Sequence, residues 1–203
     1  VVGGWVKICG LTSAAEAGSA CEAGADALGV NFFRGSPRFC SREAAREIVM
    51  AVPRSVTVFG VFVGLERRRI MEYVEEVGLG GVQLHGGEDP QEAEGWELPV
   101  IRAVAVHSRD IAEAALDTAH GHRVLLEGPG GGGSGSGWSW DLVQGLPLGE
   151  ALVAGGLRPD NVAEVVRSLE PWGVDAASGV ESAPGVKDTG LVREFIANAK
   201  SAR

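Results

Sequence analysis

Short apolar runs alternate with longer amphipathic runs along the whole chain. The apolar runs have the length of β-strands and carry few polar positions, which is typical of strands covered on both faces. They are Val6–Ile8, Ala27–Phe32, Thr57–Phe62, Gly81–Leu84, Val100–Ala105, Arg123–Leu126, Leu152–Ala154 and Val174–Ala176. The amphipathic runs predict helices at Ser13–Ala23, Ser41–Val52, Glu66–Val77, Pro90–Gly95, Arg109–Thr118, Trp140–Gln144, Pro159–Ser168 and Gly190–Lys200.

The regular alternation predicts a single domain, residues 1–203, built around a parallel sheet. Eight strand–helix units predict that this sheet closes into a (β/α)8 barrel, the TIM-barrel architecture. Such barrels usually take ~250 residues, so a chain of 203 residues predicts short loops and some abbreviated helices. A doubly wound open sheet is the alternative. It is disfavoured because no Gly-x-Gly-x-x-Gly pattern follows the first strand.

Composition and charge narrow the choice of partners. The net charge of -9 disfavours nucleic acid or an anionic membrane as the main partner, but it allows a small anionic substrate. The chain has three cysteines without Cys-x-x-Cys spacing and no paired histidines. This pattern disfavours both a disulfide framework and a structural zinc site. There is no leader-like start and no apolar run of the ~20 residues that a membrane helix needs. We therefore expect a cytoplasmic protein.

The segment Gly128–Gly137 is almost entirely glycine and serine. By composition it resembles a flexible linker between two domains. By position it follows the sixth predicted strand, and neither flank carries enough strands to form a barrel alone. We interpret it as a loop at the active site.

Chemically active side chains follow the predicted strands. In a barrel the carboxyl ends of the strands form the active site. Cys9 ends the first strand on the same face as Lys7, and a neighbouring lysine favours the thiolate. The alternative is that Cys9 is a small buried hydrophobe, and the segment by itself favours that reading.

Carboxylates end the sixth and eighth strands. Glu127 leaves the apolar run Val124–Leu126, where partial desolvation would favour the protonated form that a general acid needs. Asp175 could orient a substrate N–H group. The alternative for each is a capping or salt-bridged carboxylate. The fork of Arg38 suits a carboxylate, although a solvated surface arginine fits equally well, and His85 is more typical of a hydrogen-bonded spacer than of a catalyst.

Two glycine-containing turns follow the seventh and eighth predicted strands. These are Gly155-Gly156 and Ser178-Gly179. Glycine lets backbone N–H groups approach an anion, and in this fold the loops after the seventh and eighth strands are the usual phosphate site. We therefore predict phosphate binding at these turns, with simple tight turns as the alternative.

Several motifs together resemble one family. They are Lys7-Ile8-Cys9-Gly10-Leu11-Thr12, Ser36-Pro37-Arg38, Gln83-Leu84-His85-Gly86, Gly132-Gly133-Ser134-Gly135, Ala154-Gly155-Gly156-Leu157, Val174-Asp175, Ser178-Gly179-Val180-Glu181 and Pro184-Gly185-Val186-Lys187-Asp188. In this order, and over essentially the whole chain, they resemble phosphoribosylanthranilate isomerase of tryptophan biosynthesis. The resemblance implies a small (β/α)8 barrel that performs an Amadori rearrangement of a phosphosugar without metal or organic cofactor, as a monomer or homodimer.

The resemblance also implies a role for each site residue. Cys9 would be the general base that removes the sugar C2′ proton, and Glu127 the general acid that protonates the furanose oxygen. Arg38 would hold the anthranilate carboxylate, and Asp175 would face the anthranilate nitrogen. The phosphate would lie against the loops Gly155-Gly156 and Ser178-Gly179.

The chain departs from the family pattern near the acid. The family normally has aspartate where this chain has Glu127, the loop behind it is short and glycine-rich, and the Trp138-Ser139-Trp140 region lacks the usual acidic residue. A displacement of the carboxyl group by about 1 Å can cost ~10²-fold in rate.

Two functions are alternatives to the isomerase. They are another phosphosugar barrel enzyme and a barrel that binds phosphate without catalysis.

Overall fold

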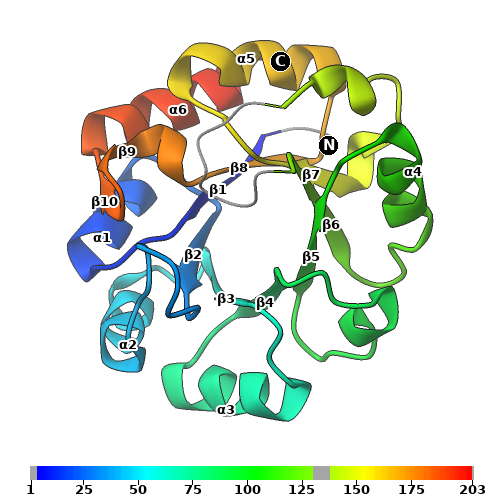
Figure 1. Ribbon diagram of the computed structural model, residues 1–203. Helices are drawn as coiled ribbons and strands as arrows, with labels where there is room; N and C mark the ends of the chain where they lie inside the picture. Colours follow the sequence, from blue (N-terminus) through cyan, green and yellow to red (C-terminus); the bar gives the residue numbers. More distant parts are fainter. Residues whose placement is uncertain (1–3, 130–137, 203) are drawn as a thin grey trace.

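The computed structural model describes residues 4–129 and 138–202. They form one closed barrel of eight parallel strands, in which each strand pairs with its neighbours in sequence and β1 pairs with β8 (Figure 1). The strands are β1 (Trp5–Cys9), β2 (Ala27–Asn31), β3 (Thr57–Phe62), β4 (Gly81–Leu84), β5 (Val100–Ala105), β6 (Arg123–Glu127), β7 (Ala151–Val153) and β8 (Gly173–Ala176). The predicted strands are confirmed, with ends that shift by at most one residue, and the open-sheet alternative is wrong.

Six α-helices cover the outside of the barrel in the described part of the chain (Figure 1). They are α1 (Ala14–Glu22), α2 (Arg42–Ala51), α3 (Arg67–Val77), α4 (Arg109–Asp117), α5 (Pro159–Leu169) and α6 (Thr189–Ser201). Local chemistry fixes their ends. The Ser13 and Ser41 side chains cap α1 and α2 by accepting hydrogen bonds from the backbone N–H of Glu16 and Ala44.

Two predicted helices are replaced by single 3₁₀ turns. The structure has η1 (Pro90–Ala93) and η2 (Trp140–Leu142) where the pattern predicted helices at Pro90–Gly95 and Trp140–Gln144. A proline starts η1, and the left-handed Gly95 follows it, so the segment is too short for a second turn. Two further 3₁₀ turns are η3 (Leu148–Glu150) and η4 (Ser178–Val180).

A small antiparallel hairpin was not predicted. It consists of β9 (Glu181–Ala183) and β10 (Val186–Lys187) and lies between β8 and α6 in the chain. Figure 1 places it beside α1 and α6, outside the barrel sheet. The hairpin directs Glu181 and Lys187 toward the barrel mouth, where both become part of the site.

Two hydrophobic layers hold these elements together. The larger layer lies between the strands and the helices, and the smaller one fills the barrel interior with Ala27, Phe59, Ile101, Ala103, Leu125, Leu152 and Ala154. The interior is thus packed with side chains rather than hollow, and a cavity opens where the strands end.

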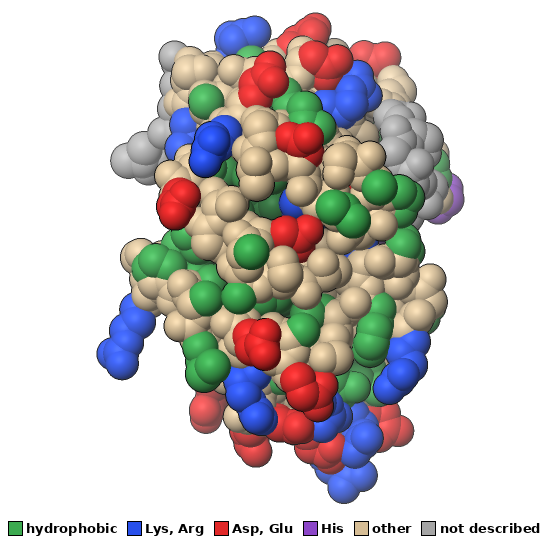
Figure 2. Space-filling model, turned by 90° about the vertical axis from the view of Figure 1, so that its left-hand side faces the viewer, with side chains coloured by type: hydrophobic (Ala, Val, Ile, Leu, Met, Phe, Trp, Pro, Cys, Tyr) green, Lys and Arg blue, Asp and Glu red, His purple; other side chains and the backbone are tan. Residues whose placement is uncertain are grey.

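The outer surface carries both signs of charge. On the described part of the face drawn in Figure 2, acidic and basic side chains are interspersed and form no broad basic patch. Among the residues that the structure describes, none of the helices has the length and apolar character required to cross a membrane.

Candidate active site

A cavity of about 800 Å³ opens at the carboxyl ends of the barrel strands. All nine residues predicted for the site line it, namely Cys9, Arg38, His85, Glu127, Gly155, Gly156, Asp175, Ser178 and Gly179. They come from six strand ends and loops that are far apart in the sequence. The barrel geometry therefore brings the whole predicted set together. The predicted loop Gly128–Gly137 lies outside the described residues except for Gly128 and Pro129, of which Pro129 lines the cavity.

Cys9 is buried at the end of β1, next to Gly29 of the paired strand β2. A Cβ atom on Gly29 would lie 2.7 Å from the Cys9 Sγ atom and 3.1 Å from the Lys7 Nζ atom, so only glycine leaves room for both side chains. Lys7 lowers the pKa of Cys9 as predicted, but burial has the larger effect and the pKa is raised overall. Lys7 thus favours the thiolate as expected, but its effect is smaller than that of burial.

Lys7 has a direct anionic partner in Asp175. Its Nζ atom donates a hydrogen bond of 2.8 Å to the Asp175 Oδ1 atom, and the two residues are register neighbours on β1 and β8. Lys7 is fully buried, so this ion pair supplies the compensation that a buried charge requires. The salt-bridge interpretation of Asp175 thus holds for one of its oxygens, while the residue also lines the cavity.

Glu127 faces the cavity from β6, across the barrel from Cys9. Its Oε1 atom lies 2.6 Å from the His85 Nε2 atom, and the His85 Nδ1 atom lies 2.9 Å from the Gln83 Nε2 atom. With the Gln83 amide as donor to Nδ1, the ring proton lies on Nε2 and points to Glu127. His85 is therefore a hydrogen-bonded partner of the predicted acid, as the spacer interpretation expected.

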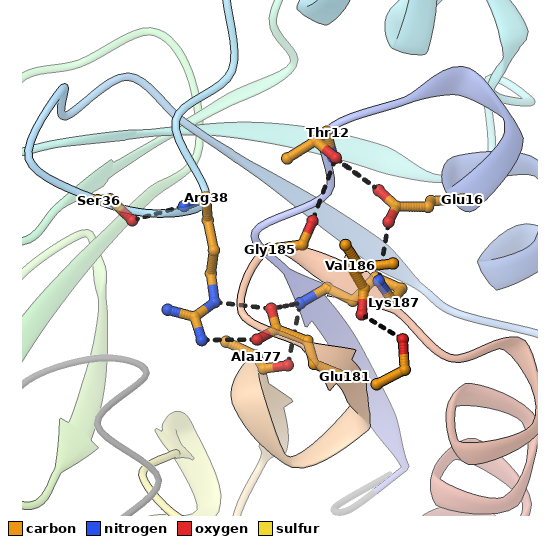
Figure 3. Close-up of polar contacts among 10 residues, drawn as sticks. Thr12, Glu16, Ser36, Arg38, Ala177, Glu181, Gly185, Val186 and Lys187 are labelled. Atoms are coloured by element: carbon orange, nitrogen blue, oxygen red, sulfur yellow. Dashed lines mark hydrogen bonds and ion pairs between the residues drawn. The ribbon is translucent and has the colours of Figure 1, made fainter.

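Arg38 lies in the loop between β2 and α2 and is buried, so the surface-arginine alternative is wrong. Its Nε and Nη2 atoms each donate to a different oxygen of Glu181 at 2.7 Å (Figure 3). The Glu181 Oε1 atom also accepts from the Lys187 Nζ atom at 2.7 Å, and Lys187 donates to the Ala177 carbonyl at 2.9 Å. The arginine is thus held by the hairpin β9–β10.

The two glycine turns meet at one side of the cavity. Gly155 and Gly156 both have left-handed backbones, with φ of 83° and 74°, which favours glycine. Gly179 lies so close to the loop after β7 that a Cβ atom at Gly179 would be 1.8 Å from the Leu157 carbonyl oxygen. These positions require glycine for their geometry, and they leave backbone groups exposed to the cavity rather than side chains.

The site contains partners that the sequence interpretation did not assign. Gln83, Glu181 and Lys187 are all buried at their side chains. The Pro184-Gly185 turn between short polar-apolar runs is a hairpin signal, and it could have indicated that Glu181 and Lys187 lie side by side. Among the described residues, no group of three His, Cys, Asp or Glu side chains is placed to hold a metal ion.

Polar groups that converge on one cavity at the strand ends, opposite backbone-lined loops, define a (β/α)8-barrel enzyme for a small anionic substrate. Residues 6–198 match the family model described as N-(5'phosphoribosyl)anthranilate (PRA) isomerase. The chain belongs to this family of isomerases.

Full-length relatives and solved structures agree with this assignment. The N-(5'-phosphoribosyl)anthranilate isomerase of Myxococcus xanthus is 48% identical over 203 residues, which cover 97% of this chain and 96% of the relative. The crystal structure of the enzyme from Thermotoga maritima superposes with a TM-score of 0.89 at 38% identity, covering 97% and 98% of the two chains. A further isomerase structure, solved with reduced 1-(o-carboxyphenylamino)-1-deoxyribulose 5-phosphate, has a TM-score of 0.85 at 36% identity, covering 97% and 98%.

Proposed function

We propose that this chain isomerises N-(5-phosphoribosyl)anthranilate to 1-(2-carboxyphenylamino)-1-deoxyribulose 5-phosphate, with Cys9 as general base and Glu127 as general acid. The observation that carries the proposal is the placement of these two groups on opposite strands of one cavity, with two glycine turns beside them. A thiol and a carboxyl group on facing walls suit a reaction that adds one proton and removes another.

The reaction balances without any added group. Glu127 protonates the furanose ring oxygen, the C1′–O bond breaks, and the nitrogen lone pair forms a protonated Schiff base. The thiolate of Cys9 then takes the C2′ proton, which gives an enolamine. This intermediate becomes the ketone when C1′ gains a proton and the C2′ hydroxyl loses one. The hydrogen bond from His85 to Glu127 fixes the carboxyl group during these steps.

The remaining site residues take supporting roles in this proposal. Arg38 binds the anthranilate carboxylate, and the oxygen of Asp175 that Lys7 does not use faces the anthranilate nitrogen. The backbone at Gly155, Gly156, Ser178 and Gly179 binds the phosphate. The three free thiols suit a cytoplasmic enzyme.

Turnover of phosphoribosylanthranilate by purified variants tests the proposal. We expect Cys9→Ala to lower kcat by at least ~10³-fold and Glu127→Gln by at least ~10²-fold, because general acid–base groups contribute about 10²–10⁴-fold each. Cys21→Ala, which alters a thiol of α1 away from the cavity, is the matched control and should retain full activity.

Each other outcome has a definite meaning. Full activity of Cys9→Ala would refute the base assignment alone. Absence of turnover by the unaltered protein, with tight binding of the product, would favour a barrel that binds phosphate without catalysis. Turnover of a different aminated phosphosugar instead would favour another enzyme of the same barrel class.

A further inference from the structure

The hairpin β9–β10 carries two charged side chains at the barrel mouth. Glu181 contacts Arg38, and Lys187 contacts Glu181. Glu181 meets the guanidinium of Arg38 through two hydrogen bonds of 2.7 Å, and Lys187 bonds to the same carboxylate (Figure 3). Two parallel N–H···O bonds fix the plane of a guanidinium as well as its position. Glu181 therefore determines how Arg38 is oriented in the cavity.

The cluster of Arg38, Glu181 and Lys187 is buried and carries an excess of one positive charge. The side chains of Arg38, Glu181 and Lys187 are 8%, 4% and 1% exposed. Burial raises the pKa of Glu181, but the hydrogen bonds and the charges of Arg38 and Lys187 together outweigh it and lower the pKa overall, so the carboxylate is ionised. The Glu181 carboxylate therefore lies between two cations, which hold it in place.

The fold anchors this hairpin independently of any ligand. The Glu16 carboxylate accepts hydrogen bonds of 2.8 Å from the backbone N–H groups of both Thr12 and Lys187. Gly185 at the hairpin turn lies so close to the loop before Arg38 that a Cβ atom there would be 2.5 Å from the Pro37 carbonyl oxygen. The hairpin is thus tied to the loops that follow β1 and β2, and it holds Glu181 in place before a substrate arrives.

We infer that Glu181 is a positioning residue, which holds the Arg38 guanidinium ready to bind the carboxylate of the substrate's aromatic ring. This inference rests on the proposed function. Arg38 lines the cavity, so Glu181 orients a guanidinium that lies where a substrate binds. An arginine that is already ordered loses less side-chain freedom when the ligand binds, so the affinity for a carboxylate is higher.

This role predicts an effect opposite in sign to that of simple electrostatics. Glu181→Gln removes a negative charge from the cluster. If charge alone mattered, the carboxylate of a ligand would be attracted more strongly by the variant. If Glu181 orients Arg38, the variant binds the carboxylate more weakly, because the arginine must be ordered during binding.

Two unreactive ligands separate these cases. They are reduced 1-(o-carboxyphenylamino)-1-deoxyribulose 5-phosphate and its counterpart without the carboxyl group, and their Kd values are measured by calorimetry. We expect Glu181→Gln to raise the Kd of the carboxylated ligand about tenfold, which corresponds to the free-energy cost of ordering one long side chain. The Kd of the ligand without a carboxyl group should change less than twofold. In an Arg38→Lys background, which lacks the planar fork, Glu181→Gln should have no further effect.

Glu16→Gln loosens the hairpin that holds Glu181, so it should weaken the carboxylated ligand in the same direction as Glu181→Gln and leave the Kd of the ligand without a carboxyl group nearly unchanged. Equal loss of both ligands in Glu181→Gln, tighter binding of the carboxylated ligand, or an unchanged Kd would each overturn the inference. Binding of neither ligand by the unaltered protein would instead refute the proposed function, since the phosphate is common to both. The same turnover with a wild-type-like Kd in Glu181→Gln would refute only the positioning role.

Discussion

Cys9 lies beside a cation and an anion that are bonded to each other. Lys7 lowers the pKa of the thiol and Asp175 raises it, while burial raises it most. At neutral pH Cys9 is therefore mostly a thiol, and its action as a base depends on the smaller thiolate fraction, which grows as the pH rises. Proton abstraction by Cys9 thus depends on how far the charges around it offset burial.

Two substitutions should shift the reactivity of Cys9 in opposite directions. Lys7→Met removes the cation and leaves Asp175, so the pKa of Cys9 rises further and alkylation by iodoacetamide at pH 8 slows by about tenfold. Asp175→Asn leaves the cation, so the pKa falls and alkylation accelerates. The rates are measured between pH 6 and 11 in a background of Cys21→Ala and Cys40→Ala, which leaves Cys9 as the one thiol in the sequence.

The opposite changes expected in the alkylation rate of Cys9 distinguish an electrostatic effect from damage to the structure. Each variant leaves one buried charge unpaired and is expected to lower the free energy of unfolding by about 3–5 kcal/mol. Loss of stability by itself exposes Cys9 and accelerates alkylation in both variants. Faster alkylation of Lys7→Met at every pH would therefore contradict this account.

Single residues of the site could be predicted, but their partners could not. The rule that a barrel uses its strand ends led to nine predicted residues, and all nine line the cavity. The pairs Arg38–Glu181 and Lys7–Asp175 join residues separated by 143 and 168 positions. Such contacts depend on strand register and loop path, which no local pattern contains. For the same reason, local patterns could not predict that burial raises the pKa of Cys9 overall.

At the scale of elements, the strands were easier to predict than the short helical segments. A buried strand is a continuous apolar run, whereas a single 3₁₀ turn such as η1 and the first turn of an α-helix share the same starting residues. The hairpin β9–β10 has only a two-residue second strand, too short for an alternating pattern. Yet these short elements carry Glu181 and Lys187, so the least predictable elements shape the mouth of the barrel.

Glycines in different elements should respond differently to an added methyl group. In β2, Gly29→Ala would place its Cβ 2.7 Å from the Cys9 Sγ atom, so we expect a loss of about 1–3 kcal/mol in stability and a fall in kcat of at least tenfold as Cys9 is displaced. In α1, Gly18 has no atom within 4 Å of such a Cβ, so Gly18→Ala should stabilise the helix by about 0.5–1 kcal/mol. Urea unfolding and steady-state kinetics measure both effects, and unchanged kcat in Gly29→Ala would show that β2 does not fix the thiol.

At the scale of the whole molecule, the two ends of the barrel have different roles. At the carboxyl ends of the strands, polar groups line the cavity. At the opposite end, Trp5 at the start of β1 packs at a tilt against Trp172 before β8, with ring centroids 4.6 Å apart, and it makes an edge-to-face contact with Phe59 at 6.3 Å. The Arg123 guanidinium lies 4.2 Å from the Trp172 ring centroid. This aromatic cluster seals the barrel where its first and last strands pair.

Trp172→Ala should therefore lower stability and leave catalysis unchanged. Removing a half-buried indole leaves a gap against Trp5 and removes the contact with Arg123, so we expect the free energy of unfolding to fall by about 2–4 kcal/mol. Because the pairing of β1 with β8 extends from Trp5 to Ile8, the backbone still holds Cys9 in register, and kcat and KM should stay within twofold at a temperature where the variant is folded. Chemical unfolding and kinetics on the same preparation check this. A large rise in KM would mean that the two ends of the barrel are coupled through β1, and that the aromatic cluster helps to position the thiol as well as to close the sheet.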